Sequence, residues 1–282
     1  MEQHICFNGE IHPIDDVKIS PINRGMMYGD GCFETFRSYS GQFLGFKQHY
    51  RRLMEALQYL NIELSINYSH FSQLIQSLLL KNELNNNDAV IRIQCWRQGE
   101  RGYETTRTGC DWMITANSLI SLIFPPLHLI TAETRVIPNS ALDRSYKLAN
   151  GLNYIVAARE SEKQHADDAL MLTMNNYISE TTKANIFWGT GNTIKTPSLK
   201  CDLLPGVTRG LVLEMLSKTK YAVEEGVFTL NDLKKADFIF ATNSISEIRA
   251  VEKLDDHHFD ANHPELNHIS SMFEVLKQMR LT

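Results

Sequence analysis

The chain has 282 residues, of which 43% are hydrophobic and 22% charged, with a formal net charge of -5 and a pI of about 6.1. This is an ordinary globular composition, long enough for two domains with separate cores. The charge balance gives no reason to expect a nucleic-acid partner, and no apolar stretch is long enough to span a membrane.

The cysteines and the first residues indicate the cellular compartment in which the protein is expected. The five cysteines are scattered, with no C-x-x-C pair and no Cys/His cluster at zinc-ligand spacing, so we expect no metal site and a reducing environment. The first ten residues lack the basic and apolar regions of a secretory signal peptide. A cytoplasmic location is therefore the default expectation.

The first part of the sequence mixes strand and helix patterns. Residues 5–14 predict a hairpin around Asn8-Gly9, and residues 32–39 and 42–46 predict two strands. Apolar residues recur at helical spacing over 47–60 and again around 71–79, and two further strands are expected at 89–95 and 111–116. The sequence therefore predicts a small N-terminal α+β domain over residues 1–118.

Residues 119–128 are predicted to be a linker, because Pro125-Pro126 cannot continue a helix and stiffens the chain. Beyond it we expect a C-terminal domain over residues 129–282. Its predicted helices cover 151–163, 208–218 and 264–280. Its predicted strands cover 129–137, 169–173, 177–179, 184–188 and 238–242.

The common phosphate-loop, dinucleotide and hydrolase motifs are absent. Six residues attract attention instead by their order along the chain: Arg52, Lys147, Glu180, Asn185, Thr208 and Ser244. Each alone has an ordinary explanation, because a lysine is usually a solvated charge, a threonine before a helix a cap, and a serine part of a turn.

Seven segments in order resemble the class-IV aminotransferases, the fold-type IV pyridoxal-phosphate enzymes. Residues 24–35 (RGMMYGDGCFET) resemble the family's R-G-x-x-(F/Y)-G-D-G-x-(F/Y)-E signature, residues 49–53 (HYRRL) its H-x-x-R-L, and residues 146–150 (YKLAN) its K-x-x-N. Residues 167–172 (DDALML), 178–187 (ISETTKANIF), 204–209 (LPGVTR) and 242–248 (TNSISEI) are similar to its later motifs. The resemblance covers residues 5 to about 250, and its specificity lies in the order and separation of the motifs.

The resemblance implies a mixed α+β and α/β fold of two domains. The small N-terminal α+β domain would be followed by a larger, β-barrel-like C-terminal domain with flanking helices, and the cofactor would lie at the domain interface. It also implies a homodimer in which loops of the smaller domain reach the partner's active site.

The same resemblance implies the roles of the site residues. Lys147 would carry pyridoxal 5'-phosphate as a Schiff base and act as the catalytic base. Glu180 would hold the pyridine nitrogen protonated. The remaining cofactor ligands would be Arg52, Asn185, the helix N-terminus at Val207 and Thr208, and Ser244 and Ile245. Arg51 adjoins Arg52 and the residues alone could exchange them, but the H-x-x-R register favours Arg52.

Substrate recognition is expected from residues 97–103 (RQGERGY), which resemble the R-G-Y run of aminodeoxychorismate lyases. In place they also match the R-x-H run of D-amino-acid aminotransferases, with Tyr103 instead of the histidine. Arg101 or Arg97 is expected to bind a substrate carboxylate, and an exposed loop arginine is the structural alternative. Phe33 belongs to a segment that is also lyase-like. Gly151 stands where a branched-chain aminotransferase would have tyrosine, unless the alignment slips by one.

These features favour a 4-amino-4-deoxychorismate lyase, which eliminates pyruvate and leaves 4-aminobenzoate. The alternative is an aminotransferase of the D-amino-acid or branched-chain type, which moves an amino group to a 2-oxo acid. Both act on a small amino substrate and share the early steps at Lys147. A non-catalytic relative that only binds a ligand is a remote third possibility, because both Lys147 and Glu180 are present.

Overall fold

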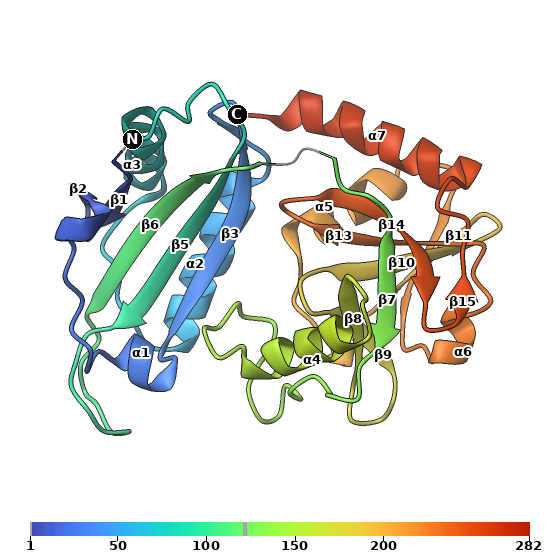
Figure 1. Ribbon diagram of the computed structural model, residues 1–282, viewed down its shortest axis with the longest axis horizontal. Coiled ribbons are helices and arrows are strands. Elements are labelled where there is room, and N and C mark those ends of the chain that lie inside the picture. Colours follow the sequence, from blue (N-terminus) through green and yellow to red (C-terminus); the bar gives the residue numbers. More distant parts are fainter. Residues whose placement is uncertain (1, 121–122) are drawn as a thin grey trace. The chain divides into compact units, whose positions relative to one another are not determined.

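The computed structural model describes residues 2–120 and 123–282, which form two compact units (Figure 1). Unit 1 consists of the described residues up to Ile120, of Tyr146–Asn150 and of Leu281–Thr282. Unit 2 consists of the described residues that follow up to Ser145, and of Gly151–Arg280. Two short pieces beyond the predicted linker therefore belong to unit 1. Of the predicted linker 119–128, residues 121 and 122 lie outside the described residues, and the part from Leu127 is a strand.

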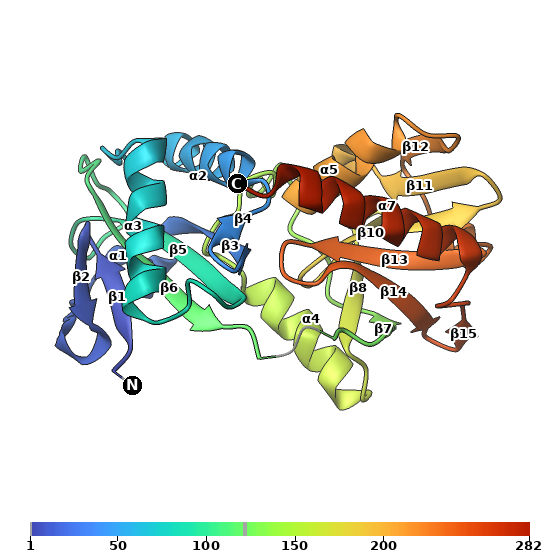
Figure 2. The same ribbon diagram turned by 90° about the horizontal axis from the view of Figure 1, so that it is seen from above.

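Unit 1 is built on a six-stranded antiparallel sheet in the order β2-β1-β6-β5-β3-β4. Its strands are β1 (His4–Phe7), β2 (Glu10–Pro13), β3 (Gly31–Tyr39), β4 (Gln42–Phe43), β5 (Ala89–Arg97) and β6 (Cys110–Ser118). Its helices are α1 (Arg24–Tyr28), α2 (Phe46–Tyr59) and α3 (Tyr68–Lys81), with a 3-10 turn at Ile14–Asp16. Helix α2 packs on β3, and α3 packs on β1 and β6 (Figure 2).

The two faces of this sheet differ because side chains alternate along a strand. Cys32, Glu34 and Phe36 of β3 are buried on the face that α2 and α3 cover. The residues between them, beginning with Phe33, are half-buried on the opposite face. Strand β5 follows the same pattern, with Arg92 on the half-buried face. That second face is the one that carries the predicted substrate residue Phe33.

Unit 2 contains a nine-stranded sheet in the order β12-β11-β10-β13-β14-β7-β8-β9, with β15 paired to β14. Its strands are β7 (Leu127–Thr131), β8 (Asp168–Leu172), β9 (Ile178–Thr181), β10 (Asn185–Thr190), β11 (Thr193–Pro197), β12 (Ala222–Gly226), β13 (Phe238–Asn243), β14 (Glu247–Leu254) and β15 (His257–His258). Its helices are α4 (Leu152–Lys163), α5 (Val207–Leu216), α6 (Leu230–Leu233) and α7 (Pro264–Arg280), with a 3-10 turn at Leu199–Cys201. The sheet curls, since β9 also contacts β10, as expected for a barrel-like domain.

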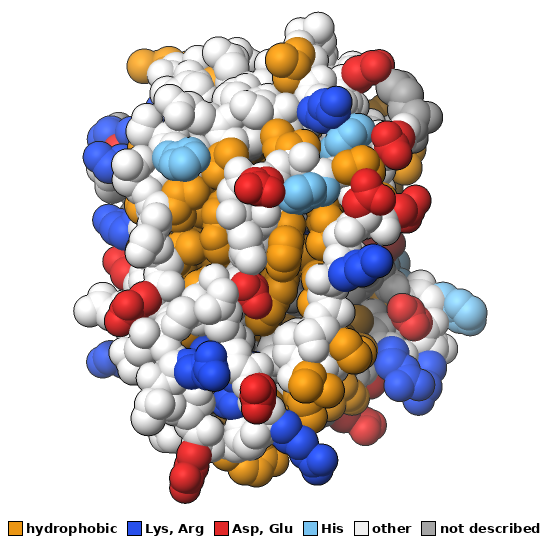
Figure 3. Space-filling view, turned by 90° about the vertical axis from the view of Figure 1, so that its left-hand side faces the viewer, with side chains coloured by type: hydrophobic (Ala, Val, Ile, Leu, Met, Phe, Trp, Pro, Cys, Tyr) orange, Lys and Arg blue, Asp and Glu red, His pale blue; other side chains and the backbone are white. Residues whose placement is uncertain are grey.

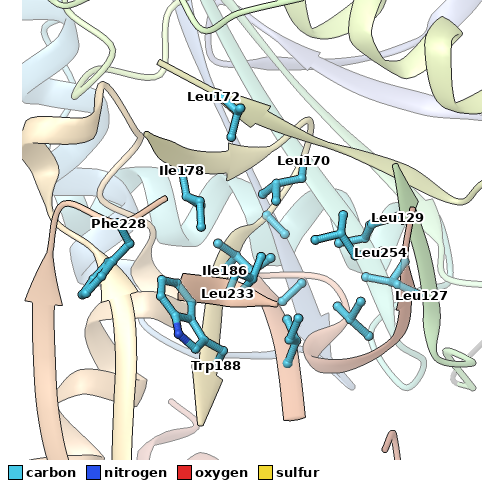
Figure 4. Close-up of a cluster of buried hydrophobic side chains, with 14 residues drawn as sticks. Leu127, Leu129, Leu170, Leu172, Ile178, Ile186, Trp188, Phe228, Leu233 and Leu254 are labelled. Carbon is cyan, nitrogen blue, oxygen red and sulfur yellow. The ribbon is translucent and has the colours of Figure 1, made fainter. Parts of the chain in front are cut away.

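A cluster of buried apolar side chains fills this curled sheet (Figure 4). It draws on strands throughout the sheet, with Leu129 from β7, Leu170 from β8, Ile178 from β9 and Trp188 from β10 among its fully enclosed members. Burying a side chain of this size stabilises a fold by roughly 1.5–3 kcal/mol. The apolar runs of the C-terminal half are therefore core strands that pack on both faces.

Most predicted elements are confirmed to within a few residues, one predicted strand is too long, and several strands were not predicted. The strand predicted over 129–137 ends at Thr131, and the chain beyond it follows an irregular path in which Ala132 and Val136 still donate backbone hydrogen bonds to β8. Strands β11, β12, β14 and β15 were not expected. The sequence of β14, EIRAVEKL, mixes charged and apolar residues in a way that fits a helix as readily as a strand.

The surface is mixed in charge. Figure 3 shows one face of the molecule on which acidic and basic side chains are interspersed. None of the helices in the described ranges is long and apolar enough to cross a lipid bilayer. Within those same ranges, no group of three or more His, Cys, Asp or Glu side chains is arranged to hold a metal ion.

Candidate functional site

Lys147 lies in a five-residue segment that extends the sheet of unit 1. The Phe33 amide donates to the Lys147 carbonyl at 3.0 Å, and the Ala149 amide donates to the Gly31 carbonyl at 2.9 Å. Between them, Cys32 and Leu148 form an antiparallel bridge. This pairing with β3 fixes the backbone of Lys147, whose side chain is half-buried with Nζ 4.7 Å from the centroid of the Phe33 ring.

A second cation, Arg92, lies over the same aromatic ring. Its Cζ is 4.0 Å from the centroid of the Phe33 ring, and its guanidinium donates to Thr35 Oγ1 and Gln94 Oε1, each at 3.4 Å. Burial lowers the pKa of Arg92. Within the described chain its hydrogen-bond partners are all neutral. Sequence reasoning missed this residue, although an arginine inside a strand of apolar residues was a visible signal.

Arg52 belongs to a buried charge cluster in unit 1. Its Nε and Nη2 donate to the Glu34 carboxylate at 2.7 and 2.8 Å, and His49 Nδ1 lies 2.7 Å from Glu34 Oε2. Helical spacing places His49 and Arg52 on the buried face of α2, opposite β3. The predicted phosphate contact of Arg52 thus depends on a guanidinium that also neutralises Glu34.

The electrostatics of this cluster follow from its burial. Burial alone would raise the pKa of the Glu34 carboxyl, but the charge of Arg52 and the hydrogen bonds from Arg52 and His49 outweigh it and lower that pKa to about 2. Burial lowers the pKa of His49, against the opposing effect of Glu34. We therefore assign a carboxylate, a guanidinium and a neutral imidazole at neutral pH.

Arg97 is a structural residue, contrary to the prediction that it binds substrate. Its Nε and Nη2 donate to the Asp30 carboxylate, and its two Nη groups also donate to the carbonyls of Leu60, Asn61 and Arg107. All five guanidinium N–H groups are therefore engaged, and the side chain is buried. The residue instead ties β5 to the end of α2.

The other predicted substrate residues, Arg101 and Tyr103, are exposed on the loop between β5 and β6. The Arg24 guanidinium donates to the carbonyls of Glu100 and Gly102, and the Gly102 amide donates to the Tyr28 hydroxyl at 2.9 Å. Tyr103 is 90% exposed, and its ring centroid lies 5.4 Å from that of Tyr28. The loop is thus tied to α1, while its two predicted recognition side chains face outward.

Glu180 is the centre of a hydrogen-bond cluster in unit 2. It is 5% exposed and lies on β9. Oε1 accepts from the Tyr154 hydroxyl at 2.7 Å, and Oε2 accepts from Asn185 Nδ2 and from the Leu204 amide, each at 3.2 Å. The predicted residues Glu180 and Asn185 are therefore in contact, and Tyr154 and the Leu204 amide also donate to the carboxylate.

Tyr154 was not predicted from the sequence. It lies on α4, and burial together with the Glu180 charge raises the pKa of its hydroxyl, which keeps it a donor. The buried side chain of Arg144 places its Cζ 4.9 Å from the centroid of the Tyr154 ring. The only sequence signal was a tyrosine seven residues after Lys147, in the helix that was expected there.

The predicted phosphate-binding residues of unit 2 meet at the start of α5. The helix begins at Val207 after Gly206, and no side chain caps it, so its first N–H groups point out of the helix end. Thr208 Oγ1 lies 3.4 Å from Ser244 Oγ, which joins the helix end to the turn between β13 and β14. The Ile245 amide already donates to Asn243 Oδ1 at 2.9 Å.

Gly206 is required by the close approach of Asn185. A Cβ atom at position 206 would lie 2.1 Å from Asn185 Oδ1, which is far inside van der Waals contact. Asn185 in turn donates to the Leu204 carbonyl at 2.8 Å. The cluster around Glu180 and the start of α5 are therefore one packed arrangement.

Comparison with known proteins places this arrangement in context. The profile of the family "Amino-transferase class IV" matches residues 31–254. A putative branched-chain-amino-acid aminotransferase of Methanocaldococcus jannaschii is 30% identical over 258 residues, which cover 89% of this chain and 88% of that protein. An aminodeoxychorismate lyase of Bacillus subtilis is 28% identical over 257 residues, covering 89% and 87%.

The fold is also found among solved structures. A branched-chain amino acid aminotransferase from Thermobaculum terrenum, crystallised in its PLP-form, superimposes with a TM-score of 0.90 at 21% identity. The alignment covers 100% of this chain and 98% of that one. The similarity establishes the fold, and the two sequence relatives carry different reaction names.

Proposed function

The chain belongs to the class IV aminotransferase family, and on this premise we propose that it is a pyridoxal-phosphate enzyme that acts on an amino-acid-like amine through Lys147. The observation that carries the proposal is the pair of cations over one ring. Lys147 Nζ and Arg92 Cζ lie 4.7 and 4.0 Å from the centroid of Phe33. A lysine amine and an arginine with neutral hydrogen-bond partners, both in contact with the Phe33 ring, suit a substrate that carries both an amine and a carboxylate.

The residues present fit pyridoxal phosphate. Lys147 supplies an amine for the cofactor's aldehyde, Glu180 a buried carboxylate for its ring nitrogen, and the uncapped start of α5 an anion site for its phosphate. When bound, this cofactor supplies an electron-poor ring that accepts the electron pair left by a departing proton. Lys147 belongs to unit 1, and Glu180 and the start of α5 belong to unit 2.

The chain's own residues have separate roles in the proposed reaction. The amine of Lys147 takes the proton from the substrate carbon that bears the amino group, and returns it later where the reaction requires. Tyr154, Asn185 and the Leu204 amide hold the Glu180 carboxylate in one orientation. Arg92 binds a substrate carboxylate and so orients that carbon toward Lys147.

The finer proposal is a 4-amino-4-deoxychorismate lyase. That substrate carries two carboxylates, and the chain offers Arg92, which contacts the same Phe33 ring as Lys147, and the exposed Arg101. Elimination breaks the C–O bond to the enolpyruvyl group, removes a ring proton and aromatises the ring, and it requires no water or oxidant. The Arg101-Gly102-Tyr103 run and the similarity to the lyase of Bacillus subtilis support this choice.

An aminotransferase is the second candidate, supported by the 30% identity to the putative branched-chain enzyme. Two assays on the purified protein separate the reactions. We expect pyruvate and 4-aminobenzoate in equal amounts from aminodeoxychorismate. Robust amino transfer to 2-oxoglutarate without these products would replace the lyase by the aminotransferase.

The shared part of the proposal has its own test. The purified chain should be yellow, because the cofactor bound to a lysine amine absorbs visible light. The variant Lys147→Ala should lose this absorbance and both activities while remaining folded. A colourless wild-type chain that takes up no pyridoxal phosphate would contradict the proposed function and favour the ligand-binding relative.

We also propose a homodimer and a cytoplasmic location. All five cysteines are free thiols, which fits a reducing compartment. Tyr103 is 90% exposed, and Leu152 and Ile155 of α4 are 72% and 58% exposed. Apolar side chains of this size on a surface are suited to contact with a second copy. Light scattering on the purified chain should give twice the mass of the monomer.

A further inference from the structure

The helix α7 is attached to both elements of the proposed phosphate site. That site is formed where the start of α5 meets the turn between β13 and β14, at Thr208 and Ser244. On α5, Glu214 accepts from Arg280 of α7 at 2.7 and 2.5 Å. At the turn, Glu247 accepts from Lys277 of α7, with each carboxylate oxygen 3.0 Å from Nζ. Figure 2 shows α7 running beside α5 and the β13–β14 pair.

The turn has an unusual residue at the position that Lys277 contacts. Asn243 and Glu247 are paired across the hairpin, which leaves residues 244–246 as the loop. Glu247 has a φ of +58°, the left-handed conformation that this loop type normally gives to glycine. Asn243 Oδ1 accepts from the amides of Ile245 and Ser246 and from the Ser246 hydroxyl. The loop is therefore held from inside by Asn243 and from outside through Glu247.

The contact with Lys277 is buried rather than a surface ion pair. The side chains of Lys277 and Glu247 are 10% and 16% exposed, and Lys277 also lies 2.6 Å from Glu274. Shielded charge pairs restrain their surroundings more than exposed ones do, because water and salt screen them less. A glutamate in a strained backbone conformation whose carboxylate meets a buried ammonium indicates a restraint on the loop.

We propose that Lys277 is a positioning residue for the cofactor phosphate, and that it acts by holding the Ser244–Ser246 loop through Glu247. This inference rests on the proposed function for the identity of the anion. Lys277 transmits its effect on the site through Glu247. It keeps Ser244 within reach of Thr208, so that the hydroxyl groups and the start of α5 present one preformed anion site.

The test uses the apoprotein and measures dissociation constants for pyridoxal phosphate and for pyridoxal, which lacks the phosphate. Lys277→Met should weaken the binding of pyridoxal phosphate about tenfold, which corresponds to about 1.4 kcal/mol. The affinity for pyridoxal should stay unchanged. Lys277→Arg, which keeps the charge, should restore most of the affinity. The control is Lys220→Met, which removes an exposed pair with Glu265 of the same helix and should change neither constant.

A double variant separates positioning from folding. Lys277→Met leaves the Glu247 carboxylate without this ammonium, and the resulting loss of stability is removed by adding Glu247→Gln. The double variant should regain its melting temperature and still discriminate poorly between the two ligands. Equal weakening of both ligands, or unchanged affinity for pyridoxal phosphate, would overturn the inference while leaving the proposed function intact.

Inorganic phosphate distinguishes a failure of the proposed function from a failure of the inference about Lys277. It should raise the melting temperature of the wild-type chain more than that of Lys277→Met, whether or not pyridoxal phosphate binds. A wild-type chain that takes up no pyridoxal phosphate contradicts the proposed function. In that case, a larger rise in melting temperature with phosphate for the wild-type chain than for Lys277→Met would still support the positioning role of Lys277. An equal rise in the two chains would contradict it.

Discussion

The Tyr154 hydroxyl donates to Oε1 of Glu180 across 2.7 Å, and so joins helix α4 to strand β9 in the interior of unit 2. The carboxylate is 5% exposed, so its charge depends on such donors for stabilisation. Tyr154 therefore helps to determine whether Glu180 can serve as a fixed negative charge.

Replacing this tyrosine tests that dependence. Tyr154→Phe should lower the free energy of unfolding by roughly 1.5–3 kcal/mol, the usual range for a hydrogen bond to a charged group. It should also lower kcat more than it raises KM, because the proposed role of Glu180 is in the chemical step, after the substrate has bound. Tyr221→Phe is the matched control, because Tyr221 donates to Glu265, a carboxylate at the surface. An equal effect on kcat in the control would contradict the role of Tyr154.

The stability of unit 1 should fall in strong acid because of Glu34. Its pKa is lowered from 4.5 to about 2 in the folded chain, so the unfolded chain binds this proton first as the pH drops. The stabilisation, about 3 kcal/mol, is present above pH 4.5 and is lost as the pH falls toward 2. In Glu34→Gln this part of the pH dependence should disappear, as urea unfolding between about pH 2 and pH 6 will show.

His49 adds a dependence at milder pH. Its pKa is lowered below the ordinary 6.5, so the unfolded chain takes up a proton that the folded chain resists. The part of the stability that depends on neutral His49 should therefore be fully present above pH 6.5 and should decline below it. His49→Asn keeps a donor near the Nδ1 position and should flatten this decline. The same substitution at His70, which is exposed on α3, is the control for the loss of an imidazole.

Two glycines of the α5 region should respond in opposite ways to alanine. Gly206→Ala brings a Cβ to 2.1 Å from Asn185 Oδ1 and should displace Asn185 from Glu180, with weaker cofactor binding and lower stability. Gly210 lies inside the same helix, where an added Cβ would meet no neighbouring atom within 4 Å. Gly210→Ala should therefore stabilise the chain by roughly 0.5–1 kcal/mol. Thermal unfolding of both variants, with cofactor titration, measures the contrast.

Arg97 and Arg101 should have different roles, one in stability and the other in substrate binding. Arg97→Met removes five hydrogen bonds from a buried site beside Asp30 and should cost about 3 kcal/mol of stability. Arg101→Gln should leave stability unchanged and raise KM for a substrate with two carboxylates. If Arg97→Met raised KM without loss of stability, its assignment as a structural residue would be wrong.

The sequence by itself determined the elements with strong local patterns and the order of the motifs. Helix α2 follows from apolar spacing, and β5 follows from strict alternation, because both signals depend on near neighbours in the chain. The motif order was enough to predict Lys147 and Glu180 as a pair and to identify the family, since seven ordered matches do not require coordinates.

Only the tertiary structure decided which side chains meet. Arg97 and Arg92 lie on one strand five residues apart, and neither spacing nor composition tells that the first is saturated by carbonyls and Asp30 while the second lies over Phe33. The contacts of Tyr154 with Glu180 and of Lys277 with Glu247 join residues 26 and 30 positions apart. Such pairs depend on the path of the whole chain, because burial and partner geometry arise only when distant segments pack.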